Sequence, residues 1–189
     1  MAGSSNTDRW HGFAFGLAAA TVIYNVLEGV ISVYFGFQDE PLTLVGFGID
    51  SFIEVVSGLG IAHMLIRIRT HPGQARDRFE RTALRITGTA FYVLVLGLTA
   101  SAAANVWTAH KPEVSIAGIV ISSISIATMW LLMRGKVATG RRLGSQAIIA
   151  DANCTKICIY MSIVLLLASG LYAAVQIPHF DTAGALALA

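Results

Sequence analysis

The sequence predicts an all-α membrane protein, a six-transmembrane-helix bundle whose sixth helix is truncated at the C-terminus. Hydrophobic residues make up 55% of the 189 positions and charged residues only 13%, against roughly 25% charged in ordinary soluble domains. A soluble fold cannot hide so much apolar surface, so part of that surface must face lipid. Long apolar stretches recur along the whole chain, and basic residues gather in alternate connections between them.

A membrane-spanning helix needs about 20 mostly apolar residues, because a helix rises 1.5 Å per residue across roughly 30 Å of hydrocarbon. Five segments meet this length, and a sixth begins near Phe180 and stops at Ala189. We expect all six to form a single transmembrane domain over residues 1–189. The expected helices cover residues 13–37, 42–66, 86–108, 114–133, 144–175 and 180–189.

Basic residues predict the orientation, because loops rich in lysine and arginine stay on the cytoplasmic side of a membrane. Two connections carry most of them, one between the second and third spans and one between the fourth and fifth. The first group is Arg67, Arg69, Arg76, Arg78, Arg81 and Arg85, and the second is Arg134, Lys136, Arg141 and Arg142. We therefore expect a multi-pass protein, integral to the bacterial inner membrane, with a cytoplasmic N-terminus.

Composition and motifs argue against several other classes of protein. The net charge of +2 is too small for a nucleic-acid partner, and no basic run carries interleaved aromatic residues. Two cysteines inside an apolar stretch do not form a secreted disulfide framework. The sequence contains no Walker A loop, zincin motif, nucleophile elbow or dinucleotide fingerprint. We expect neither an enzyme nor a tightly bound cofactor.

Ionisable residues inside the expected spans are the candidate site, because each costs roughly 2.5–3.5 kcal/mol at the bilayer centre. Asp50 and Glu54 lie four residues apart in the second span and therefore share one helix face. Cys154 and Cys158 repeat this spacing in the fifth span. Counting residues from the membrane boundary places Asp50 level with Cys158 and Glu54 level with Cys154. Together they predict a tetrahedral metal site suited to zinc, with the thiolates favouring softer ions such as cadmium or copper(I).

Other polar residues lie near these four. Asp151 and Thr155 share the cysteine stripe, and Asp151 is placed to orient a ligand. Glu28, with Asn25 nearly one turn before it, is interpreted either as a relay carboxylate or as a hydrogen bond that packs helices. Lys156 lies off the stripe and is interpreted as the partner of an acid on another helix.

Simpler interpretations of the same residues stay open. The Asp50 and Glu54 carboxyl groups could pair with Lys156 or stay protonated, since burying them as charged groups is costly. Free cysteine often serves as a small buried hydrophobe, and Cys154 and Cys158 could do no more than pack.

The sequence resembles the cation diffusion facilitators, in the short form that lacks the cytoplasmic C-terminal domain. YNVLEGVISVYFG is similar to the first helix of that family, LVGFGIDSFIEVVSG to the second, ADANCTKIC to the ligand stretch of the fifth and HFDTAGALALA to the start of the sixth. The resemblance implies six helices, both termini in the cytoplasm and a homodimer. It also implies ligands at Asp50, Glu54, Cys154 and Cys158, where the fifth helix of the family usually carries His and Asp.

These observations predict a proton-coupled divalent-metal transporter working in efflux, with zinc as the leading substrate and cadmium or another soft transition metal as alternatives. Metal ligands must lose their protons to bind, so metal ions and protons compete for one site in the lipid bilayer. One alternative is an organic-cation/proton antiporter that uses the charges of Glu28, Asp50 and Glu54. Another is a membrane metal sensor that transports nothing.

Overall fold

A computed structural model describes residues 2–37, 42–71, 76–108 and 116–175 of the chain. Within these ranges the fold is all-helical. The helices are α1 (Ala2–Gly36), α2 (Leu42–Thr70), α3 (Arg76–Thr108), α4 (Ile116–Leu143) and α5 (Gln146–Val175). Residues 180–189, where the sequence predicts a sixth helix, lie outside the described part of the chain.

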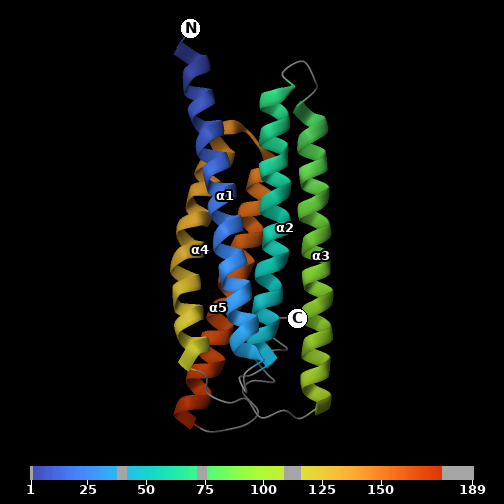
Figure 1. Cartoon of the computed structure of the whole chain (residues 1–189), viewed down its shortest axis with the longest axis vertical. Coiled ribbons are helices and arrows are strands. Elements are labelled where there is room, and N and C mark those ends of the chain that lie inside the picture. Colours follow the sequence, from blue (N-terminus) through green and yellow to red (C-terminus); the bar gives the residue numbers. More distant parts are fainter. Residues whose placement is uncertain (1, 38–41, 72–75, 109–115, 176–189) are drawn as a thin grey trace.

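The five helices run side by side as a bundle (Figure 1). α1 packs most extensively on α2 and also touches α4, while α4 packs along α5. α3 lies at the edge of the bundle against α2 and α5. α5 therefore meets three helices, α2, α3 and α4. The residues on α2 and α5 that the sequence singles out thus belong to neighbouring helices.

Four helix termini extend well beyond the predicted spans, and all four lie at one end of the bundle, uppermost in Figure 1. α1 begins at Ala2 and α3 at Arg76, while α2 continues to Thr70 and α4 to Leu143. The predictions followed apolar composition, which marks the length inside the hydrocarbon. A helix satisfies its own backbone hydrogen bonds and can continue into water where its side chains are polar. We call this the basic end, after Arg67, Arg69, Arg78, Arg81, Arg141 and Arg142.

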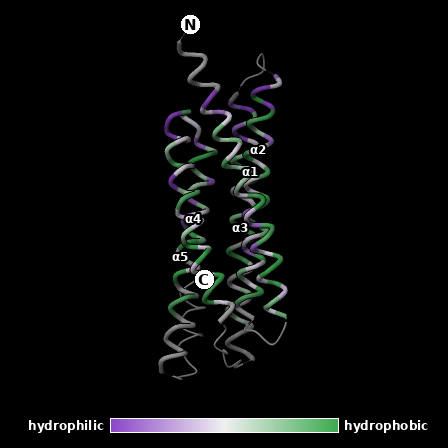
Figure 2. The backbone as a smooth tube through the Cα atoms, turned by 60° about the vertical axis from the view of Figure 1, so that its left-hand side comes forward, coloured by the Kyte–Doolittle hydropathy of each residue, from purple (hydrophilic) through white to green (hydrophobic). Residues whose placement is uncertain are grey.

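Three of the described helices are long and apolar enough to cross a membrane: Arg9–Gly36, Leu44–Thr70 and Gly118–Leu143. The described part of the chain therefore supports a helical membrane protein with three such spans, where the sequence analysis expected six. Figure 2 shows the hydrophilic residues gathered towards the basic end and apolar residues over much of the remaining length.

The bundle is apolar outside and holds many polar residues within, beside a buried apolar cluster. Large apolar side chains such as Ile23, Leu96 and Leu131 point outwards, and Leu131 is 65% exposed. Many of the fully buried side chains are polar instead. They are Thr21, Asn25, Ser32, Ser122, Ser125, Thr139, Ser145, Thr155 and Ser162. This distribution fits a bundle surrounded by lipid, where the apolar surface needs no protein partner and the polar groups must find theirs inside.

Glycines allow α1 and α2 to approach closely. A Cβ atom at Gly48 would lie 2.7 Å from Cγ2 of Val33 and 2.9 Å from the carbonyl oxygen of Gly29. Neither neighbour can move far, because one is backbone and the other a β-branched side chain. Small residues at such crossings let membrane helices pack against each other's backbones. This contact holds α2, and with it Asp50 two residues further on, against α1.

Replacing Gly48 by alanine should therefore separate α1 from α2 and lower the free energy of unfolding by about 1–3 kcal/mol, the usual cost of overpacking. Thermal unfolding in detergent micelles measures this change. Gly16→Ala is the matched control, since a Cβ atom at Gly16 meets nothing within 4 Å. Equal stability of the two variants would contradict the close approach.

Candidate functional site

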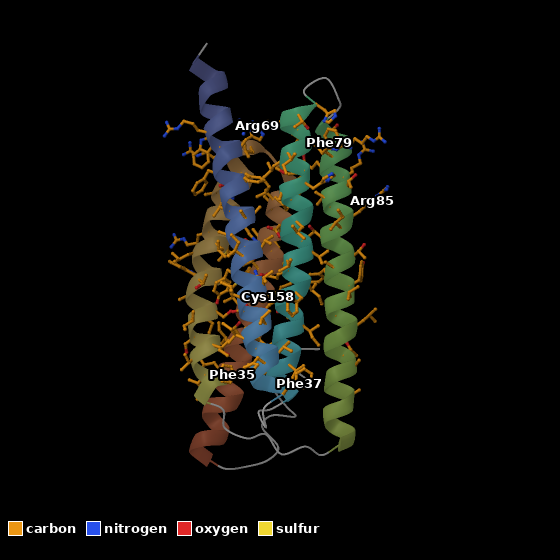
Figure 3. All side chains as sticks on the ribbon, in the orientation of Figure 1. Phe35, Phe37, Arg69, Phe79, Arg85 and Cys158 are labelled. Atoms are coloured by element: carbon orange, nitrogen blue, oxygen red, sulfur yellow. The ribbon has the colours of Figure 1, made fainter. Side chains whose placement is uncertain are left out.

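The centre of the bundle holds a contact between an acid of α2 and a thiol of α5. The Sγ atom of Cys158 donates a hydrogen bond to Oδ1 of Asp50 at 3.5 Å. Both side chains are buried, and Figure 3 shows Cys158 at mid-height inside the bundle. The two residues are 108 positions apart in the sequence. Their contact agrees with the depth at which residue counting places each of them.

Glu54 lies one helical turn beyond Asp50 and is the least satisfied acid of the site. Its side chain is 5% exposed, and neither carboxylate oxygen accepts a hydrogen bond of normal geometry. The Cys158 thiol and the Lys136 ammonium group are near enough to interact with it electrostatically. Buried polar atoms are almost always hydrogen-bonded, and a buried carboxylate without a partner is costly. The Glu54 carboxylate is therefore suited to binding a cation.

Cys154 is a free thiol with partial exposure, next to the charges of Asp151, Glu54 and Lys136. No hydrogen bond within the described residues joins it to Asp50 or Glu54. In this conformation no group of three or more His, Cys, Asp or Glu side chains is close enough to hold a metal ion, as far as the described residues go. The four-ligand set therefore stays a prediction, in which the Asp50–Cys158 contact supplies one pair.

A buried ion pair adjoins the four candidate ligands. Lys136 of α4 is 2% exposed, and its Nζ atom lies 2.8 Å from Oδ2 of Asp151 on α5. Nζ also donates a hydrogen bond to Oγ1 of Thr155 at 2.9 Å. The sequence analysis wrongly assigned Lys136 to a cytoplasmic connection, because α4 continues as a helix past the predicted span. Lys136 is therefore buried, although its charge led us to expect it at the surface.

Hydroxyl groups of α2 and α3 complete this network. Ser57 donates to Oδ1 of Asp151 at 2.7 Å and lies 3.0 Å from the Thr87 hydroxyl. Since the Ser57 proton is used on Asp151, Thr87 donates to Ser57. The network thus joins α2, α3, α4 and α5. It lies one helical turn nearer the basic end than Glu54 and Cys154, because Ser57 follows Glu54 by three residues and Asp151 precedes Cys154 by three.

Lys136, Ser57 and Thr87 did not enter the predicted site, although the sequence carries a signal for Lys136. Buried positions of α4 recur every three or four residues, the spacing of one helix face. They are Ser122, Ser125, Met129, Leu132, Lys136, Thr139 and Leu143. Extending the stripe of serines by this period reaches Lys136. No such sequence pattern singles out Ser57 or Thr87. Their role becomes visible only when the structure places them near Asp151.

Lys156 does not have the role that the sequence analysis gave it. Its side chain is exposed, and its ammonium group lies 5.6 Å from the ring centre of Tyr160, one turn further along the same helix. The expectation that Lys156 pairs with an acid on another helix is therefore wrong. Asp151 forms its ion pair with Lys136 instead. Because Asp151, Thr155 and Cys158 occupy the inward face of α5, Lys156 lies on the outward face.

Glu28 forms hydrogen bonds that pack α1 on α2. Its two oxygens accept from the Tyr24 hydroxyl at 2.8 Å and from the Ser51 hydroxyl at 2.9 Å. Asn25 donates to the backbone oxygen of Thr21 at 2.9 Å, and its own Oδ1 atom has no partner. Glu28 interacts electrostatically with Asp50 and Glu54. The packing interpretation of Glu28 is observed, and its nearness to the two acids is compatible with a relay as well.

Comparison with known proteins yields one informative similarity. No family model matches the chain, and no solved structure is a significant match. Over 137 residues, 70% of this chain, the sequence is 26% identical to an uncharacterized transporter of the archaeon Methanocaldococcus jannaschii. The aligned region covers 48% of that protein, so this chain spans about half the length of the curated relative that it matches.

Removing Lys136 should leave Asp151 as a buried charge without a cation. We expect Lys136→Met to lower the free energy of unfolding by about 3–5 kcal/mol, the usual cost of breaking a buried ion pair on one side. The double variant Lys136→Met/Asp151→Asn should recover most of this loss, because both charges are then gone. Unfolding in detergent, followed by circular dichroism, measures the differences.

Lys156→Met is the matched control, since this lysine is exposed and should change stability by no more than about 0.5 kcal/mol. If Lys136→Met were as stable as Lys156→Met, or if the double variant were no better than the single one, Lys136 and Asp151 would not form the buried pair.

Proposed function

We propose that this protein is a proton-coupled transporter of divalent transition-metal cations, with zinc as the leading substrate and cadmium or another soft metal as alternatives. The observation that carries the proposal is the Glu54 carboxylate, buried without a hydrogen bond beside the Asp50–Cys158 contact. The similarity to a protein named a transporter supports transport in general. Efflux is the proposed direction.

The buried charges support a cation as the substrate. Among the described residues the interior holds the acids Glu28, Asp50, Glu54 and Asp151 but only one basic side chain, Lys136. Asp151 forms an ion pair with that lysine, and Glu28 accepts hydrogen bonds from two hydroxyl groups. Asp50 and Glu54 therefore lack compensation and need protons or a cation to stay in a low-dielectric interior. Exchange of one for the other is the chemistry of an antiporter.

The donor atoms favour a transition metal over an organic cation. In the present contact the thiol hydrogen of Cys158 points to the Asp50 carboxylate. A metal ion that takes the place of this hydrogen would be held by both atoms, and Glu54 would supply a third donor. Zinc accepts both sulfur and carboxylate oxygen as ligands, and softer metals prefer the sulfur. An organic ammonium ion would gain charge attraction from a thiolate but could not be coordinated by it. Asp151 and Thr155, both bound to Lys136, would position Cys154 and Cys158 from the same helix.

We further propose six spans, with the basic end in the cytoplasm. The basic end carries the arginines that the positive-inside rule assigns to that side. Single cysteines introduced at Gln74 and at Glu113, in a protein whose own cysteines are replaced by serine, should react with impermeant reagents from opposite sides. Gln74 should react only from the cytoplasmic side. Reaction of both positions from one side would overturn this topology.

Ligand variants test the site in proteoliposomes. Asp50→Asn or Glu54→Gln should abolish zinc transport, because each removes an anionic donor from a set of at most four. Cys158→Ser should weaken cadmium transport more than zinc transport, since oxygen replaces a soft donor. Cys154→Ser is the internal comparison and should have the smaller effect, because Cys158 is the thiol in contact with Asp50. Normal transport of every metal by the double serine variant would show that the thiols only pack.

The same vesicles report proton coupling through an internal pH-sensitive dye. A metal gradient should drive protons in the opposite direction, because metal and protons compete for the same donor atoms. Asp50→Asn should remove the proton signal together with the metal flux. Metal flux without a proton signal would contradict antiport but leave metal transport standing. A proton signal driven only by organic cations would favour an organic-cation antiporter, and metal binding without flux would favour a sensor.

A further inference from the structure

A cavity lies between α1 and α4 at the basic end, away from the candidate metal site. It measures about 360 Å³ and is lined by Arg9, Trp10, Phe13 and Arg142. Among the residues whose side chains are described, no acid lines it. Two guanidinium groups therefore share one hollow with two aromatic rings, and nothing in the proposed transport cycle uses them.

Aromatic contacts give this cavity a firm wall. The Arg142 guanidinium group lies over the Trp10 ring, 4.8 Å from its centre, and so links α4 to α1. The Trp10 and Phe13 rings meet edge to face with centres 5.9 Å apart. Trp10 also packs against the buried cluster that includes Ala14, Ile61 and Met64. A guanidinium group stacked on a ring keeps its N–H donors at its edges free for an anion.

The cavity lies at the start of the apolar stretch of α1. The expected span of this helix begins at Phe13, and Arg9 and Trp10 lie within one turn before it. That is the level at which α1 enters the hydrocarbon. Phospholipid phosphates occupy this level, and arginine and tryptophan are enriched there. Phe13 is half exposed one turn further into the span and extends the wall towards the acyl region.

We propose that this cavity binds the phosphate group of an anionic phospholipid, with the arginines on the phosphate oxygens and the first acyl carbons against Phe13. Arginine is suited to this contact because its planar fork binds two phosphate oxygens at once. Free inorganic phosphate shares the headgroup chemistry, but it would make no use of an apolar wall that opens towards the membrane. The proposal needs only that the protein is embedded in a bilayer, and it stands or falls independently of transport.

A second cavity supplies a comparison within the molecule. It measures about 370 Å³, lies between α2 and α3, and has apolar walls with one arginine, Arg85. Figure 3 shows Arg85 directed away from the bundle on α3. The described residues that line it include one cation and no aromatic ring, so this cavity should distinguish poorly between anionic and zwitterionic lipids. Arg85→Gln is therefore a matched charge control.

Tryptophan fluorescence can detect the bound lipid directly. The protein has three tryptophans, so Trp107→Phe/Trp130→Phe leaves Trp10 as the only reporter. The protein is placed in phosphatidylcholine nanodiscs that contain a small fraction of phosphatidylglycerol. Bromine on the acyl chains of one lipid at a time quenches Trp10 when that lipid is adjacent. Quenching is expressed relative to the same discs without bromine, so that changes in the intrinsic fluorescence of Trp10 cancel.

We expect brominated phosphatidylglycerol to quench Trp10 far beyond its share of the lipid, with a preference of roughly fivefold for each arginine, the order found for basic residues at anionic membranes. Arg9→Gln and Arg142→Gln should each reduce the preference. Arg142→Lys should keep only part of it, because lysine lacks the fork. Arg85→Gln should leave it unchanged, and circular dichroism should show that all variants are folded.

Three results would overturn the proposal. The first is equal quenching by the two brominated lipids in the parent protein. The second is an Arg85→Gln effect as large as that of Arg142→Gln. The third is loss of phosphatidylglycerol quenching in millimolar inorganic phosphate but not in sodium chloride of the same ionic strength, which would assign the cavity to free phosphate.

Discussion

The buried ion pair between Lys136 and Asp151 is the constraint on which the rest of the bundle depends. Two charges inside a lipid-embedded protein are tolerated only when they are paired and their remaining polar atoms are hydrogen-bonded. Thr155, Ser57 and Thr87 provide those hydrogen bonds from three helices. The rotation of α4 about its axis is thereby tied to those of α2 and α5, since turning any of them would break a bond to a buried charge. α3 is tied in indirectly, through the hydrogen bond of Thr87 to Ser57.

This network also defines the surroundings of the candidate site. Glu54 lies one turn from the ion pair and interacts electrostatically with both Lys136 and Asp151. It accepts no hydrogen bond from the groups of the network. Asp50 is held by a weak donor, a thiol at 3.5 Å. The layer around Lys136 and Asp151 thus has its hydrogen bonds satisfied, whereas the next layer, with Asp50 and Glu54, does not. Under the proposed function, the unsaturated layer is the one that would bind the substrate cation. Glu28, on the far side, is held by hydrogen bonds from Tyr24 and Ser51.

An arginine lying over an aromatic ring recurs in the bundle. Arg142 lies over Trp10, and Arg134 lies 4.7 Å from the ring centre of Trp130. Arg67 lies over Phe79. Each pair lets a cation lie against an apolar surface. The pair at Trp10 also adjoins a cavity that a second arginine lines, which is why a lipid is proposed there.

The sequence by itself determined what depends on order along one helix. Apolar length predicted where the five described helices lie, and spacing by four placed Asp50 with Glu54 and Cys154 with Cys158 on single faces. Counting residues from the membrane boundary even matched the depth of Asp50 to that of Cys158. Helical periodicity and rise are local properties, so a single chain segment is enough to specify them. The end of a helix is less local, and α4 ran on past the apolar span that was used to predict it.

Only the tertiary structure decided which faces meet. It buried Lys136 and exposed Lys156, the reverse of what their positions relative to the predicted spans suggested. It brought Ser57 to Asp151 across 94 positions of sequence, and Arg142 to Trp10 from another helix. Such pairings depend on how helices rotate and slide against each other, which the close approach at Gly48 and the buried hydrogen bonds settle jointly. No periodicity within one helix contains that information, because the partner that selects each face lies on another helix.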